Sequence, residues 1–447
     1  MSLEEKIATK QAVICVIGLG YVGLPHAAAF GQAGFRVVGL DVNPRRVAAV
    51  NQGVSEIADV PSAVLAELVA AGRLWATTDY RCIADVDVVL ICVPTPFDAT
   101  KTPDLSYIVA AAEGIQPHLR PGQMVILQST TFPGTTEEVV QPILERSGLA
   151  AGRDFHLVFS PERIDPGNPT YSAHNTPKVV GGLTPACTDL ACRLFRHLTA
   201  QVHPVSTPRA AEMTKLLENI FRSVNIALVN ELALLMERMG IDIWEVIAAA
   251  RTKPFGFMAF TPGPGVGGHC IPVDPYYLSW KAREFDFYTK FIELAAEVNA
   301  DMPEHVVHLV AKGLNLLGRP LKGARVLVLG VAFKRNVDDA RNSPAERVIE
   351  LLLEAGAHVR YHDPYVPCFR VGGRALHRPE VLLESTPLAE GLAECDAAVI
   401  VTGHTNVDYR SVIERAPVVI DSVNVTAGLD GAAGKVLRLG APLPAPG

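Results

Sequence analysis

The feature that most constrains the fold is a glycine-rich turn between a strand pattern and a helix pattern. Residues 12–17 form a continuous apolar run of β type, and residues 18–23 read Gly-Leu-Gly-Tyr-Val-Gly. An alanine-rich helical pattern follows and ends at Gly34, and a second apolar run, residues 35–40, ends at Asp41. A glycine turn in this setting, with an acid roughly 20 residues downstream, predicts a βαβ unit that binds a dinucleotide.

Each residue of the turn has a task in dinucleotide binding. Gly18 permits the tight turn, Gly20 lets a pyrophosphate approach the helix N-terminus, and Gly23 lets the helix pack on the sheet. We expect Tyr21 and Val22, in the same turn, to complete the contact with the cofactor. A plain strand-to-helix turn is the alternative interpretation of the glycines.

Asp41 indicates which dinucleotide is bound. Its carboxylate is expected to accept hydrogen bonds from the ribose hydroxyls and to repel a 2′-phosphate, which favours NAD over NADP. Arg45 and Arg46 follow closely and keep NADP open as an alternative. We count Arg46 among the predicted cofactor contacts.

Three further strand patterns each run into a polar loop: residues 87–93 before Thr95, residues 124–128 before Thr130, and residues 156–159 before Glu162. Because ligands bind at the carboxyl edge of parallel strands, we expect these three side chains to line one crevice. After the second loop, Thr135 and Glu138 have the spacing of a capping box, which predicts the start of a helix.

Composition limits the class of protein. The 447 residues are too many for one core, so two or three domains are expected. A content of 49% hydrophobic and 19% charged residues is typical of a folded soluble protein, and the net charge of −7 argues against a nucleic-acid partner. No consecutive apolar run reaches the ~20 residues that span a bilayer. The eight cysteines lack disulfide density and metal-ligand spacing, so we expect reduced thiols in a cytoplasmic protein without a metal.

The second half of the chain predicts a long helix and then a second α/β domain. Residues 208–239 form an apolar helical pattern on which Lys215 and Asn219 share a face. A new strand pattern, residues 324–330, enters a loop that carries Lys334 and Arg341, a place suited to binding phosphates. A solvated surface loop is the alternative. The predicted fold class is α/β, with two Rossmann-like doubly wound domains joined by a long central helix. The expected boundaries are 1–205, 206–312 and 313–447.

Residues 263–274 place a cysteine in an open, glycine-rich loop. The run reads Gly-Pro-Gly-Val-Gly-Gly-His-Cys-Ile-Pro-Val-Asp, with Cys270 one turn before Asp274. Because Gly267 and Gly268 have no Cβ, a bulky ligand could approach the backbone beside the thiol. Such a loop suits a covalent nucleophile, whereas a free cysteine is commonly a small buried hydrophobe. The loop alone leaves both interpretations open.

Taken together, these motifs resemble the nucleotide-sugar 6-dehydrogenases, the family of UDP-glucose and GDP-mannose dehydrogenases. The resemblance is collinear over nearly the whole chain and rests on residues 18–23, 93–96, 129–134, 160–163, 212–219, 265–274 and 333–344. Residues 264–275, 131–137 and 336–339 are most similar to the branch that acts on UDP-N-acetylhexosamines, and within it to the enzymes of UDP-N-acetylglucosamine.

The resemblance implies an NAD-dependent, two-step oxidation of the sugar's 6-hydroxyl to a uronate. The first product, an aldehyde, is captured by a cysteine as a thiohemiacetal, oxidised to a thioester and hydrolysed. The catalytic residues carried over are Cys270 as nucleophile, Lys215 for the oxyanion, Asn219 and Asp274 for the water, Glu162 as candidate base and Thr130 between nicotinamide and sugar.

The same resemblance implies substrate contacts and a homodimer. The contacts carried over are Glu162, Arg163, Lys215, Asn219, Gly267, Lys334 and Arg341, with Arg251 reaching the substrate of the neighbouring subunit. Residues 313–447 are thereby expected to bind the UDP-sugar, and residues 206–312 to form the dimer core. Two departures stand out. The spacing from Arg251 to Cys270 differs from that of glucose-specific enzymes, and their second acid after Ser-Pro-Glu is replaced by Ile-Asp-Pro at residues 164–166.

Other functions are weighed against this one. A UDP-glucose 6-dehydrogenase, or an enzyme of UDP-N-acetylmannosamine or UDP-N-acetylgalactosamine, differs by a few loop residues. A simple NAD-linked alcohol dehydrogenase of the hydroxyacid type has no need of Cys270 or of a second α/β domain. A nucleotide-sugar sensor without catalysis has no need of the catalytic side chains that are present.

Overall fold

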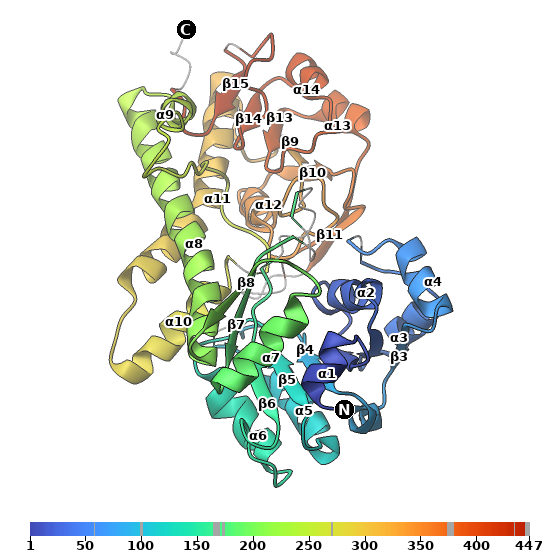
Figure 1. Ribbon diagram of the computed structural model, residues 1–447. Helices are drawn as coiled ribbons and strands as arrows, with labels where there is room; N and C mark the ends of the chain where they lie inside the picture. Colours follow the sequence, from blue (N-terminus) through green and yellow to red (C-terminus); the bar gives the residue numbers. More distant parts are fainter. Residues whose placement is uncertain are drawn as a thin grey trace. The chain divides into compact units, whose positions relative to one another are not determined.

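Two units, each built on its own β-sheet, make up the chain (Figure 1). The computed structural model describes residues 1–57, 59–98, 102–163, 170–171, 175–269, 271–372, 380–432 and 434–442. Unit 1 comprises Met1–Glu218 and Tyr276–Phe287, and unit 2 comprises Asn219–Pro275 and Tyr288–Gly447. The three domain boundaries expected from the sequence stay a prediction.

The sheet of unit 1 has the strand order β3-β2-β1-β4-β5-β6-β7-β8. Its strands are β1 (Val13–Ile17), β2 (Arg36–Leu40), β3 (Leu74–Thr77), β4 (Val88–Ile91), β5 (Met124–Leu127), β6 (His156–Phe159), β7 (Lys178–Gly182) and β8 (Val202–Val205). The helices are α1 (Leu3–Ala8), α2 (Gly23–Ala33), α3 (Pro44–Asn51), α4 (Ser62–Ala70), α5 (Ser106–Ile115), α6 (Gln141–Glu145) and α7 (Pro185–Phe195). All neighbouring strands are parallel except β6 and β7. The βαβ unit predicted from the glycine turn is therefore confirmed.

Alternating side chains of the strands fill two separate cores. Ile14 and Val16 of β1 belong to the cluster that also contains α2, α4 and α7, whereas Cys15 and Ile17 belong to the cluster with α5 and α6. Successive side chains of a strand point to opposite faces of the sheet, so helices cover both faces. This is the doubly wound arrangement, which places loops and ligands at the carboxyl edge.

Unit 2 repeats this arrangement with a smaller sheet of order β10-β9-β13-β14-β15. Its strands are β9 (Arg325–Leu329), β10 (His358–His362), β13 (Ala397–Ile400), β14 (Val419–Asp421) and β15 (Val436–Arg438). Separately, β11 (Cys368–Val371) pairs antiparallel with β12 (Val381–Glu384). Its helices are α9 (Ile243–Ala250), α11 (Lys290–Leu316), α12 (Pro344–Glu354), α13 (Leu388–Glu394) and α14 (Tyr409–Arg415). Val326 and Val328 face the core shared with α11 and α12, while Leu327 and Leu329 face α13 and α14.

Helix α8 (Pro208–Met239) has the bounds predicted from its apolar pattern. Its first eleven residues belong to unit 1 and the rest to unit 2, and α10 (Asp274–Ala282) is likewise divided. Among the described residues, only α8 is long and apolar enough to cross a membrane, a test that core helices of soluble proteins also pass. In unit 2, Asn230 of α8 bonds through its amide to Asn299 of α11 at 2.9 Å, which satisfies a buried polar group within the fold.

Candidate active site

The glycine turn after β1 leaves space beside its backbone in unit 1. Gly18 has φ +89°, and a Cβ there would lie 2.7 Å from the carbonyl oxygen of Cys92 at the end of β4. A Cβ at Gly20 would meet no heavy atom within 4 Å in the described part of the chain, so space remains for a ligand beside the backbone. Gly23 opens α2, and a Cβ there would overlap Gly18. Tyr21 and Val22 lie in this turn. These features fit a bound pyrophosphate.

Asp41 closes the other side of the turn. One carboxylate oxygen accepts from the N–H of Leu19 at 2.8 Å, and the other accepts from Asn43 at 2.9 Å. The guanidinium of Arg46 donates to the first oxygen at 3.1 Å. A carboxylate has about four acceptor positions, so capacity remains for a ribose hydroxyl. The residues present fit NAD, and the positive charge of Arg46 is paired with Asp41.

The loops after β4 and β5 carry Thr95 and Thr130 at the same edge. The hydroxyl of Ser129 donates to the carbonyl oxygen of Val93 at 2.7 Å, which links the two loops. The hydroxyl of Tyr277 donates to the carbonyl oxygen of Thr95. The segment Tyr276–Phe287 therefore packs with unit 1 and supports this edge.

The predicted capping box of Thr135 and Glu138 is wrong. Thr135 makes no side-chain cap bond and precedes a π-helical turn, Thr136–Val140. Glu212 of α8 takes the capping role instead, because its carboxylate accepts from Gly134 N at 2.6 Å and Thr136 N at 2.9 Å. A buried carboxylate from a distant helix outcompetes the local cap and fixes the loop that contains Thr130.

Glu162 lies in a buried cluster of charged groups. One oxygen, Oε2, is 2.8 Å from Lys178 Nζ and 2.9 Å from His26 Nε2, and the other accepts from Arg163 N at 2.7 Å. The carbonyl oxygen of Val22 lies 2.9 Å from His26 Nδ1, which therefore donates. Burial raises the pKa of Glu162, but the charge of Lys178 and the contacts of Lys178 and His26 with the carboxylate hold it well below its ordinary value. An ionised carboxylate of such low pKa is a weak base.

Sequence reasoning missed Lys178 and His26. Lys178 starts an otherwise apolar strand and is fully buried, and an isolated lysine inside an apolar run was the available signal. Arg163 also has internal partners: its guanidinium bonds to both carboxylate oxygens of Glu218, at 2.6 and 3.2 Å. Lys215, one turn after Glu212 on α8, is buried in the same unit. The substrate contacts expected of Arg163 and Lys215 stay predictions.

In unit 2, two loops are joined to each other. We define the cysteine loop as residues 263–273 and the β9–α12 loop as residues 330–343; Cys270 itself lies outside the described residues. The amide of Asn342 donates to the carbonyl oxygen of Gly268 at 3.0 Å, and Gly268 N donates to Arg341 O at 3.2 Å. A Cβ at Gly267 would lie 2.9 Å from Asn342 O. The glycines therefore admit the β9–α12 loop, and the substrate contact expected of Gly267 stays a prediction.

His269 and Asp339 strengthen this junction. His269 Nε2 lies 2.9 Å from an oxygen of Asp339, and the guanidinium of Arg341 donates to the same carboxylate at 2.7 Å. Burial raises the pKa of Asp339, but the bonds from His269 and Arg341 hold it far below its ordinary value. Arg341 is exposed and Lys334 is half-buried in the same loop. His269 was not singled out from the sequence, although its place next to Cys270 was a signal.

The structure brings Asn219 and Asp274 together, whereas their expected roles toward the water stay predictions. The side-chain amide of Asn219 donates to a carboxylate oxygen of Asp274 at 2.5 Å, and both side chains are buried. Asp274 is the first residue of α10, where a carboxylate stabilises the positive end of the helix dipole. Arg251 is exposed at the C-terminus of α9. Lys215, Thr130 and Glu162 belong to unit 1, whereas the Asn219–Asp274 pair belongs to unit 2.

Three segments of the chain match domains of one family. Residues 12–199 match the UDP-glucose/GDP-mannose dehydrogenase family, NAD binding domain; residues 209–301 match its central domain; and residues 327–428 match its UDP binding domain. The fold predicted from the sequence is thereby confirmed.

Individual relatives extend the match. A UDP-N-acetyl-D-glucosamine 6-dehydrogenase from Pseudomonas aeruginosa is 41% identical over 359 residues, which are 80% of this chain and 84% of the relative. A UDP-N-acetyl-D-mannosamine dehydrogenase from Pyrococcus horikoshii is 35% identical over 92% of this chain and 95% of the relative. The solved structure of a UDP-D-ManNAc dehydrogenase from Pyrococcus horikoshii has a TM-score of 0.85 at 33% identity, and the match covers 96% of this chain and 99% of that one.

Proposed function

Because the chain belongs to the UDP-glucose/GDP-mannose dehydrogenase family and is an NAD-dependent UDP-sugar 6-dehydrogenase, we propose that its substrate is a UDP-N-acetylhexosamine, and specifically UDP-N-acetylglucosamine. The observation that carries this choice is the 41% identity to an enzyme named for that sugar. The match to a UDP-N-acetyl-D-mannosamine dehydrogenase makes that epimer the second candidate. UDP-N-acetylgalactosamine and UDP-glucose are the remaining alternatives.

The proposed reaction is a double oxidation at C6. NAD, when bound, would supply the hydride acceptor, and two NAD molecules used in succession would take the two hydrides. The Cys270 thiolate adds to the C6 aldehyde, and the carbonyl oxygen becomes an oxyanion that Lys215 stabilises. Loss of a second hydride leaves a thioester between Cys270 and the sugar. Water then attacks the thioester, which releases the uronate and a proton and returns the thiol.

The remaining side chains are assigned to water and to orientation. The Asn219–Asp274 pair has a carboxylate whose acceptor capacity exceeds one bond, so it can orient the hydrolytic water. Glu162 is ionised and held by Lys178, and we assign it to hydrogen-bonding rather than to strong general-base catalysis. Thr130 lies on the loop that Glu212 fixes and is assigned to the region between nicotinamide and sugar. Lys334 and Arg341 are assigned to the substrate phosphates.

A stoichiometric assay tests the reaction and the substrate together. The enzyme would be supplied with NAD and, separately, with UDP-GlcNAc, UDP-ManNAc, UDP-GalNAc and UDP-glucose. We expect two NADH per UDP-GlcNAc and a product whose mass is that of the uronate. One NADH per sugar would identify a simple alcohol dehydrogenase. A faster double oxidation of another sugar would keep the mechanism and change the substrate.

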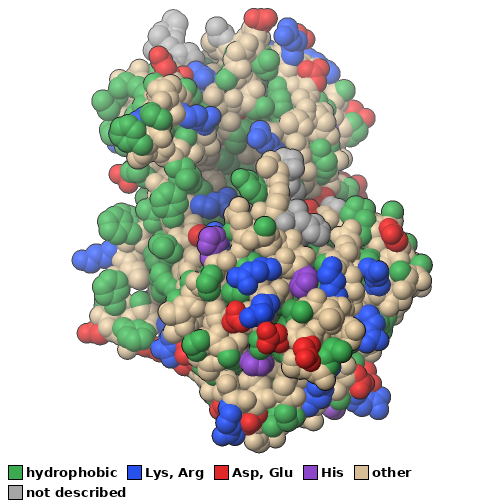
Figure 2. Space-filling model, in the orientation of Figure 1, with side chains coloured by type: hydrophobic (Ala, Val, Ile, Leu, Met, Phe, Trp, Pro, Cys, Tyr) green, Lys and Arg blue, Asp and Glu red, His purple; other side chains and the backbone are tan. Residues whose placement is uncertain are grey.

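We also propose a symmetric homodimer built on the part of α8 in unit 2. Phe221, Leu228 and Leu235 recur every seven residues and are each exposed by 44–52%, while Ala227 and Ala233 on the same helix are buried in the unit. Figure 2 shows hydrophobic side chains along the edge that α8 occupies in Figure 1. An exposed apolar stripe of this kind is typical of a helix that packs against a second copy.

Light scattering tests the dimer with a matched pair of variants. Leu235→Glu should yield a monomer, because it places a charge in the apolar stripe. Leu316→Glu, at an equally exposed leucine of α11, should leave the assembly unchanged. A fully active wild-type monomer would contradict the dimer and the role of Arg251 at the neighbouring substrate.

Three further assignments complete the proposal. The domain limits are 1–205 for NAD binding, 206–312 for the central dimerisation region and 313–447 for UDP-sugar binding, and they are supported by the order of the family matches. The protein is assigned to the cytoplasm. Burial in the proposed dimer, rather than insertion in a membrane, accounts for the apolar character of α8. Cell fractionation tests this location: recovery of the protein with membranes after a salt wash would contradict it.

A further inference from the structure

The two sheets share a structural feature. In each unit, an aspartate directly follows the second strand of the βαβ unit, which is β2 in unit 1 and β10 in unit 2. Asp41 follows β2, and Asp363 follows β10. Both accept hydrogen bonds from the first βα loop of their unit. Asp41 accepts from Leu19 N, and one oxygen of Asp363 accepts from Val331 N at 2.7 Å and from Ala332 N at 3.0 Å.

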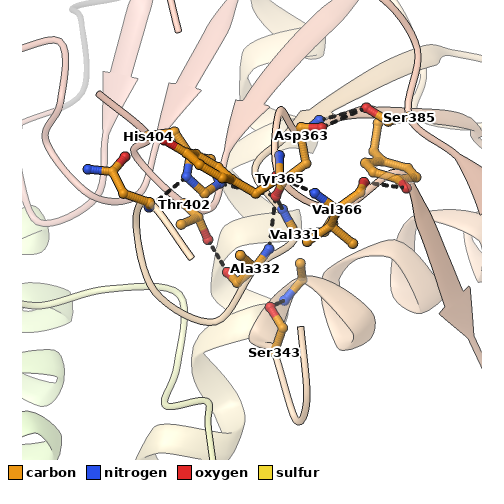
Figure 3. A network of polar contacts seen from close by, with 12 residues as sticks. Val331, Ala332, Ser343, Asp363, Tyr365, Val366, Ser385, Thr402 and His404 are labelled. Atoms are coloured by element: carbon orange, nitrogen blue, oxygen red, sulfur yellow. Dashed lines mark hydrogen bonds and ion pairs between the residues drawn. The ribbon is translucent and has the colours of Figure 1, made fainter. Parts of the chain in front are cut away.

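Asp363 nevertheless differs from Asp41, because its carboxylate is enclosed by internal donors. Its other oxygen accepts from Tyr365 N at 2.8 Å and Val366 N at 3.1 Å, and His404 Nε2 lies 3.1 Å from the first oxygen (Figure 3). The side chains of Asp363 and His404 are both fully buried. Burial raises the pKa of Asp363, but the bonds from His404 and the backbone lower it below its ordinary value. The carboxylate therefore stabilises the fold and has no acceptor position left for a ribose hydroxyl.

His404 connects this carboxylate to the β9–α12 loop. Its Nε2 faces an ionised acceptor and therefore donates, which leaves Nδ1 as an acceptor. Nδ1 accepts from the backbone N–H of Asn336 at 2.9 Å. The ring of Tyr365 packs beside the imidazole, with 5.0 Å between ring centroids. The histidine thus has one orientation and one tautomer, and both are set by Asp363.

The contact of His404 falls on a strained position of the loop. Asn336 has φ +62°, in the left-handed region that non-glycine residues avoid. Its side-chain oxygen accepts from Thr405 N at 3.0 Å and from the hydroxyl of Thr405 at 3.1 Å. Two residues before Lys334, the carbonyl oxygen of Ala332 accepts from the hydroxyl of Thr402 at 2.6 Å. Lys334 is therefore flanked, two residues away on each side, by backbone groups bound to the segment after β13.

We propose that His404, oriented by Asp363, is a positioning residue that holds the β9–α12 loop in the conformation in which Lys334 meets the pyrophosphate of the substrate. The inference rests on the proposed function, in which Lys334 and Arg341 bind these phosphates. His404 does not itself touch the substrate. It acts through the Asn336 N–H and reduces the conformational freedom that the loop would lose on binding.

Two variants of His404 separate its two hydrogen bonds. An asparagine oxygen falls near the position of Nδ1, and a glutamine amide falls near that of Nε2. We expect His404→Asn to keep the acceptor for Asn336 N–H and to bind UDP within about threefold of wild type. We expect His404→Gln to lose that acceptor and to raise the Kd for UDP about tenfold, the loss typical of one buried hydrogen bond. UDP binding would be measured by isothermal titration calorimetry on the full chain, and the Kd for NAD should not change.

Two controls distinguish positioning from general destabilisation and from an error in the proposed function. Val419→Ala, in the buried strand β14, should lower the Tm and leave the Kd for UDP unchanged. Lys334→Ala should weaken UDP binding; if it does not, the proposed phosphate site is wrong. If Lys334→Ala weakens binding while both His404 variants bind UDP equally well or equally poorly, only the role of His404 is wrong.

Hydrogen exchange on the wild type tests the same proposal if the variants do not fold. The amide of Asn336 should exchange its hydrogen slowly before UDP is added, because it is bound to His404 in the free protein. Fast exchange at Asn336 in the free protein, with protection only after UDP binds, would overturn the proposal.

Discussion

His269 Nε2 lies 2.9 Å from a carboxylate oxygen of Asp339, and this contact joins the residue before Cys270 to the loop that carries Lys334 and Arg341. The same carboxylate receives the guanidinium of Arg341 at 2.7 Å. One aspartate therefore orients a group beside Cys270, the proposed nucleophile, and a group assigned to the substrate phosphates. The geometry links substrate binding to the position of the cysteine loop within one unit.

Replacing Asp339 should impair both binding and chemistry. Asp339→Ala releases His269 and Arg341 together, so we expect the KM for the UDP-sugar to rise about tenfold and kcat to fall as well. The neighbouring exposed Asp338→Ala serves as the control and should keep both constants near wild type. Steady-state kinetics with saturating NAD gives the answer. Wild-type constants for Asp339→Ala would mean that the contact has no role in turnover.

The buried pair of Glu162 and Lys178 should be strongly coupled in stability. Glu162→Gln leaves the Lys178 charge buried without its carboxylate partner, and Lys178→Met leaves the Glu162 charge buried without its lysine partner. Removing one partner of a buried pair costs about 3–5 kcal/mol. The double variant should lose less stability than the sum of the two single variants, because each single variant leaves one buried charge unpaired and the double variant removes both charges. Urea unfolding measures the cycle, and strictly additive losses would contradict the coupling.

A surface ion pair provides the control for that cycle. Arg193 and Asp189 lie four residues apart on α7 at 2.8 Å, and both are about half exposed. Exposed pairs of this kind contribute little to stability, because solvent screens both charges. Asp189→Asn, which leaves the ion pair of Arg193 with Glu4 in place, should therefore keep the free energy of unfolding close to that of wild type.

Local patterns in the sequence predicted the fold well, because the interactions behind them are local. The glycine turn and the apolar pattern of α8 depend on residues that lie close together in the sequence. The capping prediction at Thr135 failed for the opposite reason. Glu212, more than seventy residues away, supplies a better acceptor than the local side chains do.

The sequence identified candidate residues for the site, but it did not identify the buried side chains that contact them. Nothing near Glu162 in the sequence identifies Lys178, because the pairing depends on the reversed strand β7, which runs antiparallel to β6. Asp363 and His404 are forty-one residues apart and meet only when β10 and β13 join the same sheet. Long-range topology decides which charges become buried together, and periodicity does not encode it.

The pKa of Asp363 predicts a pH dependence of stability. In the unfolded chain an aspartate titrates near pH ~3.9, and in the fold its pKa is lower. The ionised form therefore stabilises the fold above that pH, and this stability is lost as the pH falls through the folded-state pKa. Asp363→Asn should lower the Tm at pH 7. Below about pH 4, the Tm of this variant should change less with pH than the Tm of wild type. Asp301→Asn, at an exposed position of α11, should retain the wild-type acid slope.

Cys270→Ser should stop uronate formation while binding is preserved. A serine hydroxyl has too high a pKa to form the covalent adduct readily, so we expect turnover to fall at least a thousandfold, about 4 kcal/mol. UDP and NAD should still bind, as calorimetry can show. Cys368→Ser, at an exposed cysteine of β11, should keep wild-type turnover. Full uronate production by Cys270→Ser would exclude the covalent route.

Asp41 and Arg46 should together decide between NAD and NADP. In the wild type the carboxylate of Asp41 lies 3.1 Å from the guanidinium of Arg46, so the acid both repels a 2′-phosphate and occupies the nearest positive charge. Asp41→Ala removes the repulsion and frees Arg46, and we expect the preference of kcat/KM for NAD over NADP to fall at least about tenfold. Adding Arg46→Ala to that variant should reverse the gain for NADP, because the charge that binds the phosphate is then lost. Because Asp41 also accepts from Leu19 N, the Tm should be measured alongside, so that weaker use of both cofactors is not mistaken for a change of preference. Equal use of the two cofactors by the wild type would show that Asp41 does not discriminate between them.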